Sequence, residues 1–313
     1  MDSEKIKIAG GYALIALIWG STWLAIRIGL DSLTPVISAG IRFSIASIFV
    51  FVLIKIRRIR LQTDASSMKI YFLLGIFSFV IPFGLVYWAE QFIPSGLASV
   101  LFAVMPFGVI LFSWLMLPDN KISVYQMSGV LVGFAGIVFI FSEDLSMEFS
   151  DYILGMLAVL VSALMQAWIS VVIKKHGKHL NPLSMNFVPL VIGGIVMIIA
   201  GFIFENSSDW VFNYKAIGSI IYLAFFGTVV TFTTYFWLLK RVNVVILSLN
   251  TFITPIVAVF LGWIILNERL SARALIGSGM VLIGILFANF RPLINFLVQN
   301  RRKIPFNDQH YPH

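Results

Sequence analysis

Residues 253–266 read ITPIVAVFLGWIIL, an apolar run with a proline inside the stretch where a helix is expected. Residues 104–117 read VMPFGVILFSWLML, and here too the proline precedes a tryptophan by eight residues. Pro106 and Pro255 lie 149 positions apart, and the same interval separates the two tryptophans. A proline in a helix interior removes a hydrogen bond and clashes with the preceding turn. Repetition of so unfavourable a feature predicts a chain made of two related halves.

The composition is typical of a membrane protein. Of the 313 residues, 59% are hydrophobic and 12% are charged, and the mean hydropathy is +0.96. A soluble domain carries about 25% charged residues, so a surface facing only water is excluded. The charges lie between apolar runs of about 20 residues, the length of helix that crosses a ~30 Å hydrocarbon core. The chain has no cysteine, so disulfides are excluded.

Ten such runs are predicted to be transmembrane helices. They lack the alternation with period two that transmembrane β-strands require. The first run is longer than the core of a cleavable signal peptide and is expected to be retained. The runs cover approximately residues 8–28, 35–55, 70–90, 95–117, 123–142, 152–173, 184–204, 215–238, 244–266 and 272–290.

The basic residues predict the orientation of these helices. With ten helices and a cytoplasmic N-terminus, 17 of the 22 Lys and Arg residues fall on the inner side and four on the outer side. Cytoplasmic loops carry the excess of Lys and Arg, so both termini are predicted to be cytoplasmic. A basic rim beside anionic lipid accounts for the sequence pI near 9.7. We therefore expect the lipid bilayer and a small-molecule substrate as partners, with no nucleic acid, and a multi-pass location in the cell inner (plasma) membrane.

The internal repeat defines the domain organisation. A shift of 149 aligns residues 87–106 with 236–255, and a shift of 148 aligns Gly129 with Gly277 and Gly136 with Gly284. The predicted units are residues 8–142 and 152–290, five helices each, followed by a cytoplasmic tail at 291–313. Because five is odd, the second half enters the membrane from the opposite side. The predicted fold is thus all-α, with ten transmembrane helices in two inverted five-helix repeats, an arrangement common in secondary transporters.

The two prolines also point to a substrate cavity. Each displaces the carbonyl four residues earlier, that of Phe102 or Thr251. An unpaired carbonyl in lipid costs several kcal/mol, so it should face protein or a water-filled cavity. Interrupted helices at matching positions of two halves mark the binding site of many transporters. A kink that serves only helix packing is the alternative.

Polar and aromatic side chains within the runs are expected to face the interior, because lipid offers polar groups no partner. Arg42 either holds a substrate carboxylate with its planar fork or bonds helix-end carbonyls and fixes packing. Asn250 needs a helix neighbour or a ligand, because a buried amide without a partner costs about 1–3 kcal/mol. The candidate cavity residues are Trp19, Thr22, Arg42, Tyr87, Trp88, Phe102, Pro106, Gln166, Asn186, Thr231, Tyr235, Trp237, Asn250, Thr251 and Pro255.

Motifs for enzymatic or metal chemistry are absent from the sequence. All 14 carboxylates fall in loops or at predicted helix ends, and the four histidines lie in a loop and in the tail. Glycine-rich phosphate loops and HExxH patterns do not occur. We expect no enzyme activity, no catalytic residue, no metal and no cofactor. Glu90 is the nearest candidate for a proton relay, and transport is expected to proceed without a strict need for a proton gradient.

Several stretches resemble one transporter family. LIWGSTWLAIRIGL followed by PVISAGIRFSIASIFVF is similar to the opening of the EamA family of the drug/metabolite transporter superfamily. PSGLASVLFAVMPFGVILFSWLML resembles its fourth helix, and LNERLSARALIGSGMVLIGILF resembles its ninth loop and tenth helix. Two departures concern Glu268 and Arg269: Asn267 replaces the usual glycine, and the first-half loop LPDNK lacks the Glu-Arg pair.

The resemblance implies ten helices around a central cavity and the export or exchange of small metabolites, often amino acids. Alternating access around the cavity is the expected mechanism. Efflux of drugs or toxic compounds is the alternative function, since aromatic and amide side chains together suit either an amphipathic metabolite or a hydrophobic drug. The sequence leaves monomer and homodimer open.

Overall fold

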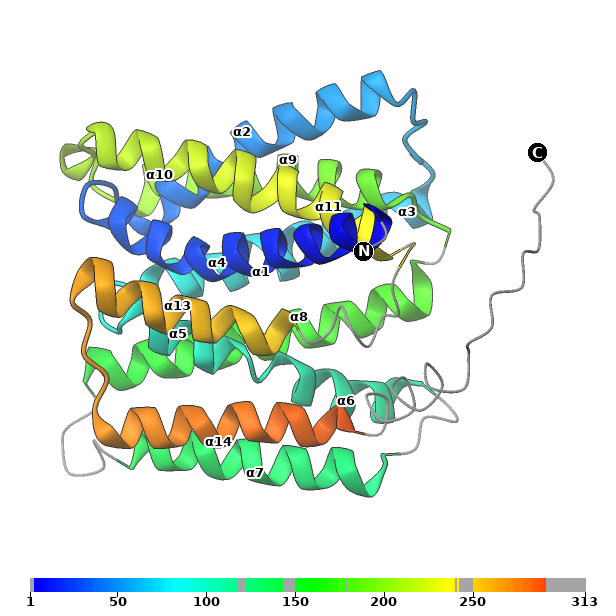
Figure 1. The fold of residues 1–313 in the computed structure, drawn as a ribbon. Helices are drawn as coiled ribbons and strands as arrows, with labels where there is room; N and C mark the ends of the chain where they lie inside the picture. Colours follow the sequence, from blue (N-terminus) through cyan, green and yellow to red (C-terminus); the bar gives the residue numbers. More distant parts are fainter. Residues whose placement is uncertain are drawn as a thin grey trace.

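The computed structural model describes residues 3–117, 122–142, 150–177, 179–239, 241 and 250–290, and within these residues the chain forms helices and no strands. Most helices lie side by side with similar axes (Figure 1). Their bounds are α1 Ser3–Leu30, α2 Pro35–Ile56, α3 Ala65–Leu74, η1 Gly75–Val80, α4 Ile81–Ala89, α5 Ser95–Phe102, α6 Met105–Met116, α7 Val124–Phe141, α8 Asp151–His176, α9 Pro182–Phe204, η2 Ser207–Asp209, α10 Tyr214–Ala224, η3 Phe225–Val230, α11 Thr231–Leu239, α13 Asn250–Leu266 and α14 Ala272–Ala288.

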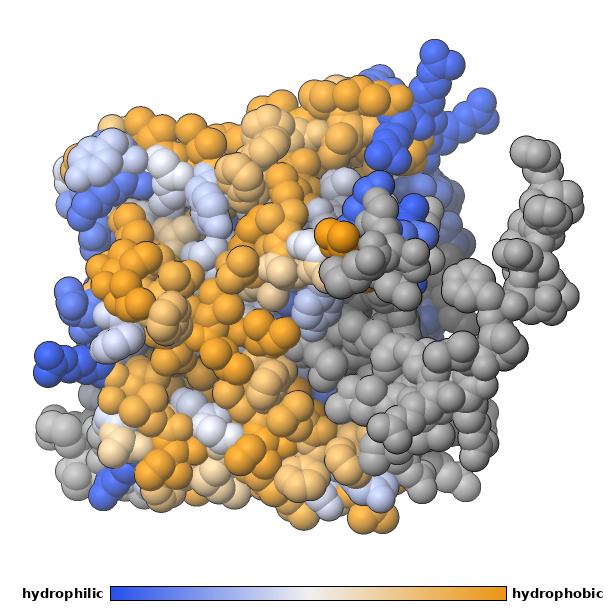
Figure 2. Space-filling model, in the orientation of Figure 1, coloured by the Kyte–Doolittle hydropathy of each residue, from blue (hydrophilic) through white to orange (hydrophobic). Residues whose placement is uncertain are grey.

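These helices account for a multi-pass membrane protein. Eight continuous helical segments in the described part of the chain are long and apolar enough to cross a bilayer, and α13 and α14 are apolar but shorter. Figure 2 shows a hydrophobic band between two hydrophilic ends. Each predicted run has a helix in the structure, although residues 244–249 of the ninth run and the predicted tail lie outside the described residues. Ten spans therefore stay a prediction.

The molecule has two ends, which we name by the residues there. The terminal end holds the start of α1, the loop 57–64 before α3 and residues 179–181 before α9. The distal end holds the loops 31–34, 90–94, 205–213 and 267–271. Helices α2 and α5 both begin at the distal end.

Glycines bring α7 and α14 into backbone contact. A Cβ added to Gly129 would lie 2.5 Å from the Gly284 oxygen, and a Cβ on Gly136 would lie 2.6 Å from the Gly277 oxygen. Gly129 is the repeat counterpart of Gly277, and Gly136 is the counterpart of Gly284. Replacing each glycine of one contact by its counterpart therefore gives the other contact. Such reciprocal contacts are the mark of an interface with two-fold symmetry. The contact between α7 and α14 therefore has this reciprocal form.

The first helix of each half packs on the other half. Helix α1 contacts α10, α11 and α13, while α8 contacts α4, α5 and α6. At Gly20 of α1, an added Cβ would lie 2.5 Å from Val257 of α13, so the two helices are in close contact. The halves are therefore interlocked rather than simply adjacent.

Helix caps also connect the halves. Among the described residues, six α-helices are capped by the side chain of their own N-cap residue, namely Asp64, Ser123, Ser150, Asn181, Asn213 and Ser271. The N-cap residues of α2 and α5, Thr34 and Pro94, make no such bond. Their first turns instead bind Glu205 and Glu268 of the second half.

Candidate functional site: a polar core between the two halves

The fourth transmembrane segment is broken at its centre. Helix α5 ends at Phe102, two turn residues follow, and α6 begins at Met105 with Pro106 in its first turn. Proline is tolerated there because the first helical N–H groups have no partner in the helix. The predicted interruption at Pro106 is present. Pro255 lies buried inside α13, which is continuous from Asn250, so the described part of the ninth segment does not repeat the break.

Each half contains a π-helical irregularity that was not predicted. Residues Gly75–Val80 and Phe225–Val230 form π-helical segments, and they lie 150 positions apart. A π segment is rare and occurs often at functional sites. The matching positions Ser78 and Thr228 lie within these two segments. Both halves therefore distort their third helix at the same depth.

The polar groups of these segments bond in different ways. Ser78 donates through Oγ to Gln166 Oε1 at 2.7 Å, and Gln166 Nε2 donates to the Ser78 carbonyl at 2.7 Å. Thr228 and Thr231 donate to backbone carbonyls of Leu223 and Gly227, at 3.1 and 2.9 Å. Gln166 is thus satisfied by α8 packing against η1, and Thr231 is fully buried.

Arg42 lies in the interior, at the meeting point of α1, α2, α4 and η3. It is 5% exposed, its Nη1 donates to the hydroxyl of Tyr87 at 3.1 Å, and its Nε has no partner among the described residues. The guanidinium lies 5.4 Å from the Phe43 ring centre and 5.2 Å from that of Phe83. Aromatic faces stabilise such a cation, but they leave donors of its planar fork available.

Glu90 belongs to this polar core and was not among the predicted cavity residues. It follows the last residue of α4, is 0% exposed, and has no hydrogen-bond partner for either carboxylate oxygen in the described part of the chain. The charges that act on it are those of Arg27, Arg42 and Glu268. An unpaired buried carboxylate is costly and marks a functional candidate. Its place at a helix end gave no sign of this burial.

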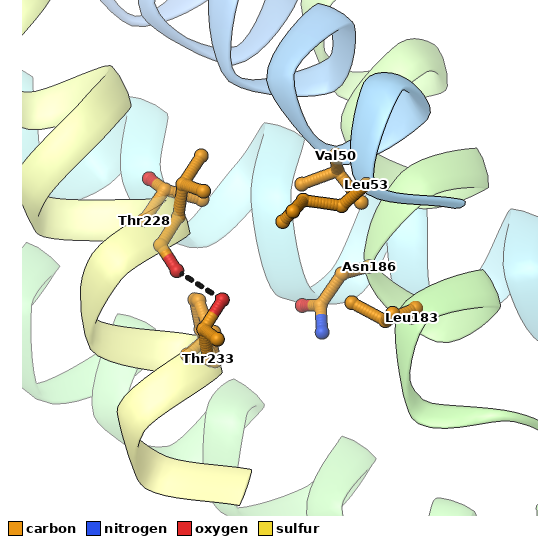
Figure 3. Close-up of a pocket in the computed structure, with 8 residues that line it drawn as sticks. Val50, Leu53, Leu183, Asn186, Thr228 and Thr233 are labelled. Atoms are coloured by element: carbon orange, nitrogen blue, oxygen red, sulfur yellow. Dashed lines mark hydrogen bonds between the residues drawn. The ribbon is translucent and has the colours of Figure 1, made fainter. Parts of the chain in front are cut away.

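A small cavity lies toward the terminal end of the same interface (Figure 3). It is lined from α2 by Val50 and Leu53, from α9 by Asn186, and from η3 by Thr228. The Asn186 amide faces the threonines of η3 and α11 across the gap and donates to the Pro182 carbonyl at 3.0 Å. The cavity volume is about 10 Å³, roughly what one water molecule needs. A molecule much larger than water does not fit in this cavity as it stands.

Aromatic rings connect the cavity region to the broken segment. The Trp19 ring lies 6.0 Å from that of Phe232 and 5.8 Å from that of Tyr235, and Trp23 lies 5.4 Å from Phe102. Phe102 packs against three separate apolar clusters of the core. Thr22 donates to the Trp19 carbonyl at 2.6 Å. These rings form an apolar surface next to the polar core.

The remaining candidates do not form one group. Trp88 packs against Phe92 at the distal end, and Trp237 stacks with Arg241 at the terminal end, 4.6 Å from ring to guanidinium. Asn250 is 4% exposed, and its Oδ1 has no partner among the described residues. Thr251 is half-buried on the same turn. Within the described ranges, His, Asp and Glu side chains do not gather into a group that could hold a metal.

Comparison with known proteins identifies the family. The sequence model of the EamA-like transporter family matches residues 8–142 and again residues 153–290. The chain belongs to the EamA-like transporter family. The family match and the relatives point to a membrane transporter, and the chain is a multi-pass protein of the inner membrane.

Relatives within the family are similar along almost their whole length. The uncharacterized transporter YoaV of Bacillus subtilis is 29% identical, over 91% of this chain and 97% of the relative. Protein PagO of Salmonella typhimurium is 29% identical over 90% and 92%, and the uncharacterized inner membrane transporter YedA of Escherichia coli is 27% identical over 90% of each. A solved crystal structure with 18% identity has a TM-score of 0.65, covering 91% of this chain and 98% of the other. That likeness supports the fold alone.

Proposed function

We propose that this EamA-like transporter moves amino acids or similar zwitterionic metabolites, as an exporter or facilitator working by alternating access. Ten spans in two inverted repeats, with both termini cytoplasmic, are part of the proposal. The terminal end then faces the cytoplasm and the distal end faces outward. The observation that carries the substrate class is the presence of two opposite, incompletely bonded charges in one buried core.

Arg42 and Glu90 suit the two charges of an amino acid. Arg42 keeps its Nε without a partner, and Glu90 keeps both carboxylate oxygens without one, among the described residues. A guanidinium binds a carboxylate through two parallel hydrogen bonds, and a carboxylate accepts from an ammonium group. The aromatic rings of Trp23 and Phe102 nearby supply an apolar surface for the side chain. The proposed site therefore has two opposite charges at one end and an apolar surface at the other.

Asn186 and Asn250 are proposed as further contacts along the pathway. Asn186 lines the cavity between α9 and η3, and Asn250 is buried with its Oδ1 unpartnered within the described residues. An amide that faced lipid would be unfavourable, so both side chains are expected to face the interior of the protein. The other predicted cavity residues, including Thr22, Tyr235 and Pro255, are proposed to shape the same path.

Counterflow in proteoliposomes tests this function. We expect uptake of radiolabelled amino acids against a preloaded substrate, and a decrease of at least tenfold for Arg42→Lys, which keeps the charge but loses the planar fork. Glu90→Gln should weaken apparent affinity by tenfold or more, because a hydrogen bond to a charged group contributes about 1.5–3 kcal/mol. Lys215→Gln, which removes an exposed pair with Asp31 at 3.3 Å, is the control and should behave as the parent.

The same assay includes hydrophobic cationic dyes, which represent the alternative of drug efflux. Transport of the dyes with no uptake of any amino acid would contradict the proposal and favour efflux. Normal amino-acid uptake by Arg42→Lys would remove Arg42 from the site. The melting temperature of each variant is measured in detergent, and only variants that melt at the same temperature as the parent are compared. Loss of the fold is thereby separated from loss of binding.

A further inference from the structure

Two glutamates of the second half cap two helices of the first half. Glu205 follows α9; it accepts from Thr34 Oγ1 at 2.7 Å, Val36 N at 2.8 Å and Ile37 N at 2.9 Å. Glu268 follows α13; it accepts from Ser95 N at 3.0 Å, Ser95 Oγ at 3.0 Å and Gly96 N at 3.2 Å. Each carboxylate therefore holds the first turn of α2 or α5 through three donors. An anion is favoured at this position by the helix dipole as well.

The surroundings are shaped to receive these carboxylates. At Gly262 an added Cβ would fall 2.3 Å from Glu268 Oε2, and at Gly201 it would fall 3.3 Å from Glu205 Oε2. Asn267 adopts φ 54°, a left-handed turn that lets the Glu268 N–H return to the Gly262 carbonyl at 3.1 Å. The glutamates are held by the fold of the second half while they bind the first.

Both contacts lie at the distal end, where other bonds also join the halves. The Ser32 carbonyl accepts from Val211 N at 2.8 Å, Trp210 Nε1 donates to Thr34 at 2.8 Å, and Arg273 donates to the Ser142 carbonyl at 3.1 Å. At the terminal end the described residues give fewer polar contacts between the halves, among them those from Ser67 to His179 at 3.3 Å and from Glu4 to Arg241 at 3.8 Å. The structure is closed at the distal end.

Opening of the distal end must separate these groups. Helix α2 carries Arg42 two turns below its capped end, and α5 leads directly to the break before Pro106. Both capped helices therefore carry parts of the proposed pathway. Movement of either helix away from the second half leaves its first-turn N–H groups without the glutamate. The six bonds exist only while the distal end is closed.

We propose that Glu205 and Glu268 are the latches of the distal gate, which hold the transporter closed at that end and release α2 and α5 when it opens. This inference rests on the alternating access proposed above, and it does not depend on the identity of the substrate. Binding of a helix N-terminus by a carboxylate of the opposite half makes the latch specific for the two helices that carry the pathway.

Labelling of a single cysteine tests the latch, since the natural chain contains none. Ser99→Cys places a thiol one turn below Ser95 at a position that is 2% exposed. The rate of its reaction with a membrane-impermeant maleimide is measured on the full chain, in intact cells and separately in inverted vesicles. Ser208→Cys, exposed at the distal end, identifies the membrane face at which that end lies.

We expect Glu268→Gln and Glu205→Gln each to raise the labelling rate at least tenfold, only from the face marked by Ser208→Cys. Glutamine keeps the length but replaces one acceptor oxygen by an amide group that repels helix N–H groups. Asp209→Asn is the matched control, because Asp209 is exposed at the same end and its carboxylate accepts from the hydroxyl of the neighbouring Ser208 at 3.4 Å. The control should change the rate by less than twofold.

A second variant displaces a latch without removing its charge. Gly262→Ala puts a methyl group into the position of the Glu268 carboxylate and should raise labelling as Glu268→Gln does. Gly218→Ala, at a site with nothing within 4 Å, is its control. Unchanged labelling in Glu268→Gln and Gly262→Ala would overturn the latch, and so would an equal rise from both faces, which indicates general loosening.

The outcomes separate the latch from the proposed function. If no amino acid is transported but the labelling rises from one face, the substrate class is wrong and the latch stands. If amino acids are transported while labelling is unchanged, the latch alone is wrong.

Discussion

At the scale of single residues, Asn267 shows how one backbone angle decides a role. The resemblance to the EamA family implies a glycine at this position, whereas this chain has asparagine. Its φ of 54° is a conformation that asparagine tolerates better than most residues with a Cβ. The turn is kept, and Glu268 binds Ser95 and Gly96 of the other half. A comparison of residue types shows the substitution, but it does not show that the backbone angle is preserved.

Asp64, which lies before α3 and outside the apolar segments, gives a pH prediction. Its carboxylate accepts from the Ser67 hydroxyl at 2.6 Å and from the Ser67 N–H at 3.0 Å. These bonds hold the pKa of the Asp64 carboxyl below its ordinary value. A lowered folded pKa means that the stabilisation is complete above the unfolded pKa and is lost as the pH falls through the folded pKa.

We therefore compare the melting temperatures of the parent and Asp64→Asn in detergent from pH 7 to pH 3. Asparagine also caps helices well, but its amide does not titrate. The difference in favour of the parent should be constant above about pH 5 and should shrink below about pH 4. The effect is small, because Asp64 is exposed. A difference that grows as the pH falls would contradict the assignment.

At the scale of helices, the positions of the apolar helices could be predicted from the sequence. The irregularities within these helices could be predicted only in part. The run 104–117 predicted a break at Pro106, which is present between α5 and α6. The same reasoning at Pro255 failed for the described residues of α13, since a proline fixes only its own turn and the neighbours decide whether the helix continues. The π segments themselves carry no proline. Pro82 follows η1 and removes the hydrogen bond to the Ser78 carbonyl, but no proline accompanies η3. Their register depends on packing against α8, α9 and α1.

The contact between α7 and α14 gives an element-scale prediction. At Gly284 an added Cβ would lie 2.6 Å from the Gly129 oxygen and 2.7 Å from the Gly133 nitrogen. Backbone atoms cannot move aside without separating the helices, so Gly284→Ala should destabilise the protein by about 1–3 kcal/mol, the usual cost of overpacking.

Gly279→Ala is the matched control on the same helix, because nothing lies within 4 Å of its added Cβ. Thermal unfolding in one detergent should show a melting temperature several degrees lower for Gly284→Ala than for the parent, with Gly279→Ala unchanged. Equal values for both variants would show that the glycine contact does not hold the helices together.

At the scale of the whole molecule, the candidate site is less predictable than the fold because it depends on contacts between segments that lie far apart in the chain. Pairs such as Arg42 with Tyr87, and Ser78 with Gln166, lie 45 and 88 residues apart in the chain. Residue type marked Arg42, Tyr87 and Gln166 as interior groups. Glu90 was assigned to a helix end, and the amount of protein covering that end is a property of the assembled halves.

The orientation gives a prediction at this scale. With ten spans and the basic residues of 55–69 and 174–178 on the inner side, both termini should be cytoplasmic. Reporter fusions after residue 313 should be active as cytoplasmic reporters, and fusions within the loop 205–213 as periplasmic ones. A periplasmic signal from the C-terminal fusion would contradict the inverted arrangement of the halves.

The caps that connect the halves have a consequence for biosynthesis. The hydrogen-bond acceptor of Ser95 is Glu268, which is synthesised 173 residues later. The acceptor of Ile37 is Glu205, which is synthesised 168 residues later. At a synthesis rate of about 5–20 residues per second, the delay is roughly 10 to 35 s. During that interval the newly inserted first half has two helix ends without their partners, and α1 lacks the surface on which it packs. The first half is therefore an unfinished structure that the nascent chain itself must complete, and any insertase or chaperone that serves this protein must shelter it until then.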